Sequence, residues 1–158
     1  MPMILKSTAF KEGQVIPKKH TGEGEDVSPA LEWSGAPAAT KQFALICDDP
    51  DAPVAEPWVH WVIYGIPAKA TKLPEGVPQS ERVADLAGAA QGMNTWPRIG
   101  YNGPMPPQGH GWHRYFFKLY ALDAELALKP GATKKDLLAA MKGHVLAEAQ
   151  LMGKYKRD

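Results

Sequence analysis

The sequence is short of several features that would place it in a specialised class. It has 158 residues and one cysteine, Cys47, so it cannot form an intrachain disulfide. No segment approaches the roughly 18 consecutive apolar residues that a membrane-spanning helix needs. The start of the chain lacks a cationic stretch followed by a long apolar run, so it does not resemble a signal peptide. We therefore expect a soluble, cytoplasmic protein with no membrane span.

Strong charge of either sign is also missing. The formal net charge is +1 at pH 7, which gives no global argument for binding nucleic acid or an acidic membrane surface. Cys47 lies inside an apolar strand pattern, which favours a buried, inert thiol over a nucleophile. We expect no nucleic-acid partner.

Sequence motifs of common enzymes are missing as well. The chain has no Gly-x-Ser-x-Gly elbow, no His-Glu-x-x-His and no Walker loop. Two histidines and two aspartates could hold Zn²⁺ or a non-haem iron, but no closely spaced ligand pair appears among them. We expect a protein that is not an enzyme and that uses no metal or cofactor.

What the chain does contain indicates one β-rich domain spanning residues 1–158. Its apolar fraction of 44% is enough for a sizeable core. Glycine and proline number 15 each and are scattered, which is typical of short strands joined by turns. Strands are expected at residues 42–48, 58–66 and 115–122, with a weaker one at 4–10. The second and third are apolar on both faces, so we expect them to be covered on both sides.

Two further regions complete the expected fold. Residues 75–111 show little periodicity, and a loop of that length should hide short strands or turns. In the C-terminal third, Thr133 and Asp136 predict a helix N-terminus. Apolar residues follow at helical spacing, Gly143 interrupts them, and Gly153 would end the pattern as a C-cap. We expect two short helices or one kinked helix, and hence an α+β, mainly β, domain with C-terminal helices.

The segment from Tyr101 to Tyr115 carries the strongest functional signal. A Gly/Pro-rich loop leads directly into His113 and Tyr115, which are two positions apart at the start of a predicted strand. Side chains two apart on a strand point to the same face. The loop therefore delivers a titratable imidazole and a phenol to one place, with exposed backbone N–H groups nearby.

The five histidines suggest different roles. His60 lies in the middle of a strand, where a hydrogen-bonded core histidine is favoured over a functional one. For His113 we favour function, because it follows a loop of the kind in which binding residues concentrate. His20 lies in a polar segment and is expected in solvent, His110 could line a rim or be exposed, and a structural role is favoured for His144.

Three aspartates crowd around Pro50. Turn chemistry explains one of Asp48, Asp49 and Asp51 well and all three less well. Clustered carboxylates repel one another, so some of them need cationic or hydrogen-donating partners. An imidazolium such as His60 or His113 would serve.

These segments together resemble the phosphatidylethanolamine-binding protein family, in its shorter, prokaryotic, Raf-kinase-inhibitor-like branch. The resemblance covers nearly the whole chain. It rests on Asp49-Pro50-Asp51-Ala52-Pro53, Trp58-Val59-His60-Trp61, Gly103-Pro104 with Pro106-Pro107 and Gly109, and His113-Arg114-Tyr115. The implied fold has two antiparallel β-sheets with a few peripheral helices.

The resemblance also implies a small surface pocket for anions, phosphate-type groups and phosphoethanolamine head groups. The ligand-binding residues carried over from the family are Asp49, Asp51, His60, Gly103, Pro104, His113 and Tyr115. Family members use no metal or organic cofactor, are known for binding and for inhibiting kinases or serine proteases, and in the prokaryotic branch are often homodimers.

Two arrangements could reconcile carboxylates with an anionic ligand. Asp49 and Asp51 could accept hydrogen bonds from His60 and His113, whose other N–H groups would then face the anion. Alternatively, a zwitterion could place its ammonium on a carboxylate. Anion binding should weaken above about pH 6.5, as imidazoles lose their protons. The leading interpretation is a non-catalytic binding module, and the alternative is a protein inhibitor of a serine protease or kinase that uses the loop between Trp96 and Trp112.

Overall fold

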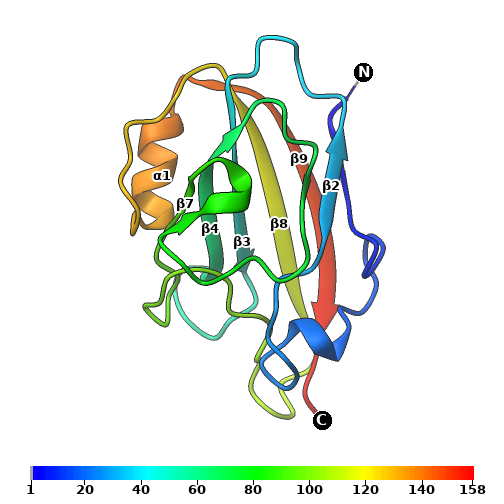
Figure 1. The fold of residues 1–158 in the computed structure, drawn as a ribbon. Coiled ribbons are helices and arrows are strands. Elements are labelled where there is room, and N and C mark those ends of the chain that lie inside the picture. The colour runs from blue at the N-terminus through cyan, green and yellow to red at the C-terminus, as the bar shows by residue number, and fades with distance from the viewer. Residues whose placement is uncertain (1) are drawn as a thin grey trace.

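The computed structural model describes residues 2–158 and consists mostly of β-strands (Figure 1). The larger sheet has six strands in the order β6-β7-β4-β3-β8-β9, and the smaller has three in the order β1-β2-β5. All of the strand pairs within both sheets are antiparallel. The expected mainly β class with two antiparallel sheets is confirmed.

The large sheet is built from β3 (Gln42–Asp49), β4 (Trp58–Pro67), β6 (Arg82–Val83), β7 (Ala89–Gln91), β8 (His113–Leu122) and β9 (Val145–Tyr155). The small sheet is built from β1 (Ile4–Lys6), β2 (Leu31–Ser34) and β5 (Lys72–Leu73). One α-helix, α1 (Lys134–Met141), and two short 3₁₀ helices, η1 (Lys18–His20) and η2 (Ala84–Leu86), complete residues 2–158.

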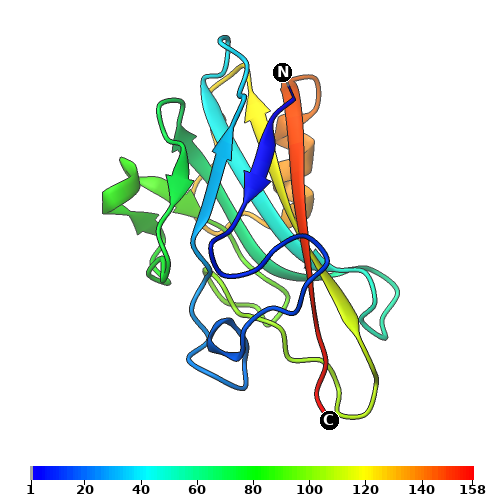
Figure 2. The same cartoon turned by 90° about the vertical axis from the view of Figure 1, so that its right-hand side faces the viewer.

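The large sheet is the middle layer of the molecule. Figure 2 shows β1 and β2 in front of it and α1 behind it. Consecutive residues of β3 alternate between the two faces: Leu45 packs in the core under the small sheet, and Ile46 packs in the core under α1. Because apolar layers cover both faces, the central strands β3, β4 and β8 are mostly buried, as predicted for β4 and β8. Cys47 is buried there as well.

The C-terminal prediction is correct for the first helix and wrong for the second. Thr133 and Asp136 form a reciprocal capping box at the start of α1. After Gly143, which has a φ of 83°, the chain becomes the long strand β9 instead of a second helix. The apolar residues of this segment fit both periods, but the free edge of β8 offers β9 a full ladder of partners. Tertiary pairing therefore decides the conformation.

Gly153 accordingly lies inside β9 and is not a helix C-cap. A Cβ atom at this position would lie 2.5 Å from Ile16 Cγ1 and 2.7 Å from Phe10 Cε2. The glycine lets the N-terminal segment pack directly on the strand. The absence of a side chain at Gly153 allows this close approach of the N-terminal segment to β9, and the residue does not end an element.

Three other expectations have mixed outcomes. The short strands expected in residues 75–111 are present as β6 and β7. The first strand ends at Lys6, because the hydroxyl of Ser7 bonds to the carbonyl of Ala30 and to the N–H of Ala9 and so turns the chain. The expectation that His20 is solvated is wrong: its ring is 2% exposed and bonds to the carbonyl of Val27.

Candidate functional site

The candidate site lies where β3 ends and its two neighbours begin. β3 lies between β4 and β8 and runs antiparallel to both, so its last residues lie beside their first residues. Asp49 pairs with Trp58 across one ladder, and Asp48 pairs with Phe116 across the other. All three strand ends lie at the lower end of the sheet in Figure 1. The antiparallel order thus brings together segments that are far apart in the sequence.

A cavity of about 240 Å³ opens at this end of the sheet. Among the predicted ligand-binding residues, it brings together Asp49, His60, His113 and Tyr115. The other lining residues are almost all apolar: Ala52, Pro53, Val54, Trp58, Trp96, Met105, Pro106 and Pro107. No lysine or arginine is among the described residues that line it. Its walls suit a small ligand with some apolar surface and few polar groups.

Asp49 and His113 form a buried pair at the base of the cavity. His113 Nδ1 donates to Asp49 Oδ2 at 2.7 Å, and both side chains are less than 5% exposed. The other carboxylate oxygen accepts the N–H of Asp51 at 2.7 Å. Burial raises the pKa of Asp49, while its bond to His113 acts in the opposite direction. The carboxylate therefore orients the imidazole, as one of the two predicted arrangements requires.

His60 behaves differently from that prediction. Its Nδ1 donates to the carbonyl of Asn102 at 2.7 Å, so it pairs with backbone and not with an aspartate. Burial lowers the pKa of His60 to about 4, which leaves the ring neutral at physiological pH. Its Nε2 is then a hydrogen-bond acceptor. The structure bears out the hydrogen-bonded core histidine favoured at this position, and the alternative of a cationic His60 bonded to a carboxylate is not realised, because the ring is buried and contacts Trp96 and Tyr115.

Asp51 lies near the cavity but does not line it. Its carboxylate makes a bidentate pair with the guanidinium of Arg114, with both contacts at 2.9 Å, and also accepts the backbone N–H of Arg114. These bonds lower the pKa of Asp51. Its predicted partner was an imidazole, and the observed partner is Arg114. Asp51 therefore fastens the turn after β3 to the start of β8.

Gly103 and Pro104 also lie outside the cavity lining, and the neighbouring residues from Met105 to Pro107 form its wall. The N–H of Gly103 donates to Asp26 Oδ1 at 2.6 Å, and the carbonyl of Pro104 accepts the N–H of Gly22. A Cβ on Gly103 would lie 2.0 Å from the carbonyl oxygen of His20. These residues anchor the loop to the N-terminal segment. Asp26 has a positive φ of 60°, and sequence reasoning missed its role.

Tyr115 carries an unusual feature of the cavity. Its hydroxyl is buried and has no hydrogen-bond partner within residues 2–158. Burial raises the pKa of the phenol well above its usual value of 10, so the group stays protonated. A buried, unpaired hydroxyl costs free energy unless something satisfies it. Tyr115 lines the cavity, so a ligand bound there that shifts a neighbouring side chain would meet an unsatisfied donor.

His110 is a site residue that sequence reasoning left undecided. Its Nδ1 lies 2.5 Å from His113 Nε2, the ring nitrogen that Asp49 does not use. Gly109 and Gly111 flank it with φ values of 74° and 88°. This Gly-His-Gly pattern, three positions before His113, was the available signal. Within residues 2–158, the structure places no group of three or more metal-ligating side chains in a metal-binding arrangement.

The two sheets and the strand-end cavity are the architecture of a class of small β-sheet binding proteins. The family model described as phosphatidylethanolamine-binding protein matches residues 6–156. The chain belongs to this family.

No helix in residues 2–158 has the length and apolar content required to span a bilayer.

Similar proteins come from archaea and bacteria. A UPF0098 protein of Methanothermobacter thermautotrophicus is 53% identical over 98% of this chain and 99% of its own length. A UPF0098 protein of Aquifex aeolicus is 49% identical, with 99% and 90% covered. The crystal structure of Escherichia coli YbcL, described as a new member of the mammalian PEBP family, superposes with a TM-score of 0.93 at 32% identity, with 100% of each chain covered.

Proposed function

We propose that this protein is a non-catalytic binding protein whose cavity takes a small phosphate-type anion or a phosphoethanolamine-like head group. The observation that carries the proposal is the cavity that gathers Asp49, His60, His113 and Tyr115, whose hydroxyl has no hydrogen-bond partner within residues 2–158. It lies beside His60, whose Nε2 is an acceptor, and near His113. A ligand must therefore supply both an acceptor and a donor.

Phosphoethanolamine supplies both kinds of group. Its phosphate oxygens accept hydrogen bonds from Tyr115 and from His113, while its ammonium or a phosphate O–H donates to His60 or Asp49. The rings of Trp58 and Trp96 provide apolar surface for its two methylene groups. With so few polar contacts, the binding free energy should be about 4–8 kcal/mol, which corresponds to millimolar to micromolar affinity.

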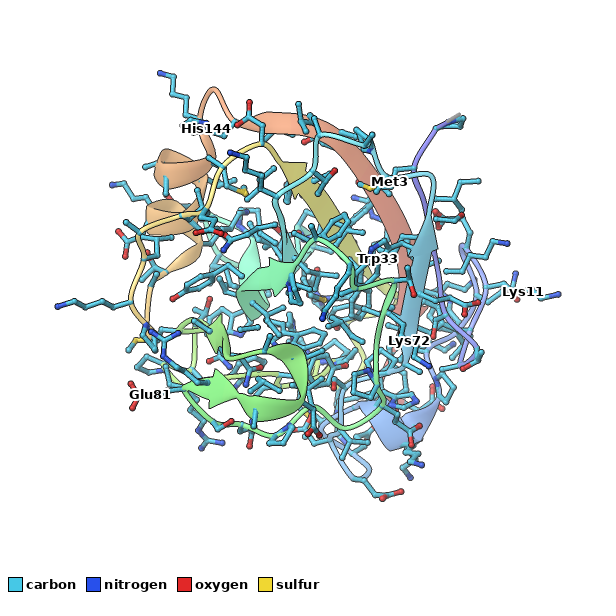
Figure 3. The ribbon with its side chains drawn as sticks, turned by 45° about the horizontal axis from the view of Figure 1, so that its top comes forward. Met3, Lys11, Trp33, Lys72, Glu81 and His144 are labelled. Atoms are coloured by element: carbon cyan, nitrogen blue, oxygen red, sulfur yellow. The ribbon has the colours of Figure 1, made fainter. Side chains whose placement is uncertain are left out.

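Calorimetric titration of phosphoethanolamine into the His113→Ala variant tests the site. We expect the variant to bind about tenfold or more weakly, because it loses a charge-assisted donor. His144→Ala is the matched control: His144 is also paired with a carboxylate, Asp123, but it is exposed and lies at the opposite end of the sheet. Figure 3 shows it beside the helix α1. Equal affinity of the wild type and His113→Ala would overturn the assignment.

A second function is supported by apolar side chains around the mouth of the cavity. Val54 and Met105, which line the cavity, are 52% and 42% exposed, and Trp112, which lies outside that lining beside His113, is 45% exposed. Aromatic residues and methionine are enriched at protein interfaces. We infer a surface that could inhibit a serine protease or a kinase. The carboxypeptidase Y inhibitor shares the fold with a TM-score of 0.54 at 14% identity, which supports the fold alone.

A panel of serine proteases and kinases, assayed with micromolar protein, tests this second function. We expect inhibition of at least one member and weaker inhibition by Trp112→Ala, because exposed aromatic side chains anchor interfaces. No inhibition across the panel would remove this alternative and leave the small-ligand proposal standing.

A further inference from the structure

The contact between His110 and His113 places a protein group where a ligand would bind. The side chain of His113 is 2% exposed, and its Nδ1 is committed to Asp49. Its Nε2 is therefore the ring nitrogen left for a ligand, and His110 Nδ1 lies 2.5 Å from it. His110 does not line the 240 Å³ cavity but a neighbouring hollow that shares His113 with it. An anion that uses His113 as a donor must replace His110 at this nitrogen.

Counting protons shows when the two rings can stay together. His113 Nδ1–H donates to a carboxylate, so in a neutral His113 the Nε2 accepts, and His110 Nδ1–H donates to it. One added proton is compatible with the same contact, because it sits on the outer nitrogen of His110 while the proton already between the rings belongs to either facing nitrogen. A second added proton makes both facing nitrogens N–H donors. Two donors cannot share a hydrogen bond, so the rings must separate.

The loop around His110 is built to allow this separation. His110 is exposed and stands between two glycines with positive φ, and a Cβ on either glycine would have no atom within 4 Å. The ring contacts His113, with centroids 4.8 Å apart, while the backbone N–H of His110 bonds to the carbonyl of Pro107. The ring can therefore swing outward without breaking the core.

The charges around the pair favour an anion after the rings part. The titratable and charged groups around it are Asp49 at the end of β3, Asp51 in the following turn, His60 on β4, Arg114 and Tyr115 on β8, and Tyr155 of β9, which pairs with His113. Lys154 and Lys156 of the C-terminal segment lie over the neighbouring Trp112 ring, 4.5 and 4.9 Å from its centroid. Arg157 donates to the carbonyl of Pro106 and pairs with Glu23. Asp51 is already neutralised by Arg114 and His60 is neutral. Asp49 therefore balances one imidazolium, and a second adds to the positive charge of the two lysines.

We propose that His110 is a gate on the anion site: it occupies Nε2 of His113 in the free protein and leaves when an anion binds together with the second added proton. The inference rests on the proposed function, because it assumes an anion at His113. It adds a residue outside the predicted ligand set and links binding to pH. In this scheme the imidazole of His110 blocks the anion site of the free protein. Protonation of both rings at lower pH separates them and exposes the site.

Calorimetry with sulfate tests the gate, since sulfate keeps the same charge between about pH 5 and 8, where imidazoles titrate. We expect His110→Ala to bind sulfate about three- to tenfold more tightly than the wild type near neutral pH, because the competing hydrogen bond is gone. Its affinity should also rise less steeply as the pH falls, since one fewer proton is taken up. His144→Ala should match the wild type.

The outcomes separate the gate from the site it controls. Equal or weaker sulfate binding by His110→Ala, with loss of binding in His113→Ala, overturns the gate and leaves the anion site standing. If neither wild type nor His110→Ala binds sulfate or phosphoethanolamine, the proposed function and the gate both fail. Nitrogen NMR of the His113 ring in the free protein adds a ligand-free check. A ring signal identical in the wild type and His110→Ala would also overturn the gate.

Discussion

Three aspartates within four positions each have different partners in this protein. Asp48 is 1% exposed and lies between Lys134 and Lys118, on the helix side of the sheet. Asp49 binds His113 in the cavity, and Asp51 binds Arg114 outside it. Alternation along β3 and the turn after it separates their side chains. Each carboxylate therefore has its own donor, which relieves the repulsion expected from their closeness in sequence.

Replacing Tyr115 by phenylalanine removes only the hydroxyl group and tests whether that group binds the ligand. The hydroxyl makes no bond within the described chain, so its removal should cost less than about 0.5 kcal/mol of unfolding free energy. Phosphoethanolamine should bind about five- to tenfold more weakly, because a ligand hydrogen bond is lost. Urea unfolding and calorimetry measure the two effects.

The control is Tyr101→Phe, which removes a buried hydroxyl that donates to the carbonyl of His20 at 2.6 Å. It should lower the unfolding free energy by about 1 kcal/mol, because it leaves a buried carbonyl without its partner. If Tyr115→Phe destabilised the protein as much as Tyr101→Phe and left the ligand affinity unchanged, the hydroxyl would be structural.

At the scale of the element, β9 shows how a partner overrides a local pattern. Ala149, Leu151, Gly153 and Tyr155 alternate with more exposed residues, which is the period of a half-buried strand. The same segment also carries apolar residues at helical spacing, and its alanine and leucine residues favour a helix. The edge of β8 resolves the ambiguity because each residue that pairs with it satisfies backbone hydrogen-bonding groups.

Gly153→Ala tests the close packing of the N-terminal segment on β9. The new methyl group would meet Ile16 and Phe10, both of them buried core side chains, at less than 3 Å. We expect a loss of about 1–3 kcal/mol of unfolding free energy, measured by urea denaturation. Gln150→Ala, at an exposed position of the same strand, should have little effect. Equal stability of Gly153→Ala and the wild type would show that this contact is loose.

At the scale of the whole molecule, the sheet order creates the site. Residues near positions 50, 60 and 113 meet because β3 runs between β4 and β8 and in the opposite direction to both. The same arrangement keeps the cavity at a sheet end, where loops replace strand pairs. His60 is buried where the cavity meets the interior, and this burial lowers its pKa.

The stability of the whole protein should fall in acid because of His60. Burial lowers its pKa from 6.5 to about 4 in the folded state, so the unfolded chain takes up a proton that the folded protein cannot. The contribution is fully present above about pH 6.5 and is lost as the pH falls to about 4, for a total of about 3 kcal/mol. Urea unfolding at a series of pH values measures this slope.

The His60→Gln variant isolates the effect, since every other titrating group is shared with the wild type. Its stability should depend less on pH than that of the wild type over this window. A wild-type profile parallel to that of His60→Gln would contradict the neutral, buried state of the ring.

The site residues were predictable to different degrees, for physical reasons. His113 and Tyr115 could be named because strand alternation and family resemblance both pointed to them, whereas Asp49 and His60 were named through the resemblance. Asp51 could not be excluded, because nothing local shows that Arg114, 63 positions away, binds it. The role of His110 was not predictable, since it depends on how a glycine-flanked loop folds back onto His113.

The sequence by itself determined the mainly β class, the buried central strands and the helix cap at Thr133, because periodicity and capping act over a few residues. Tertiary structure alone decided that residues after Gly143 form a strand, that His60 is neutral, and that His110 covers His113. Each of these depends on partners or burial supplied by distant parts of the chain. Local patterns set what each segment can become, and packing chooses among the possibilities.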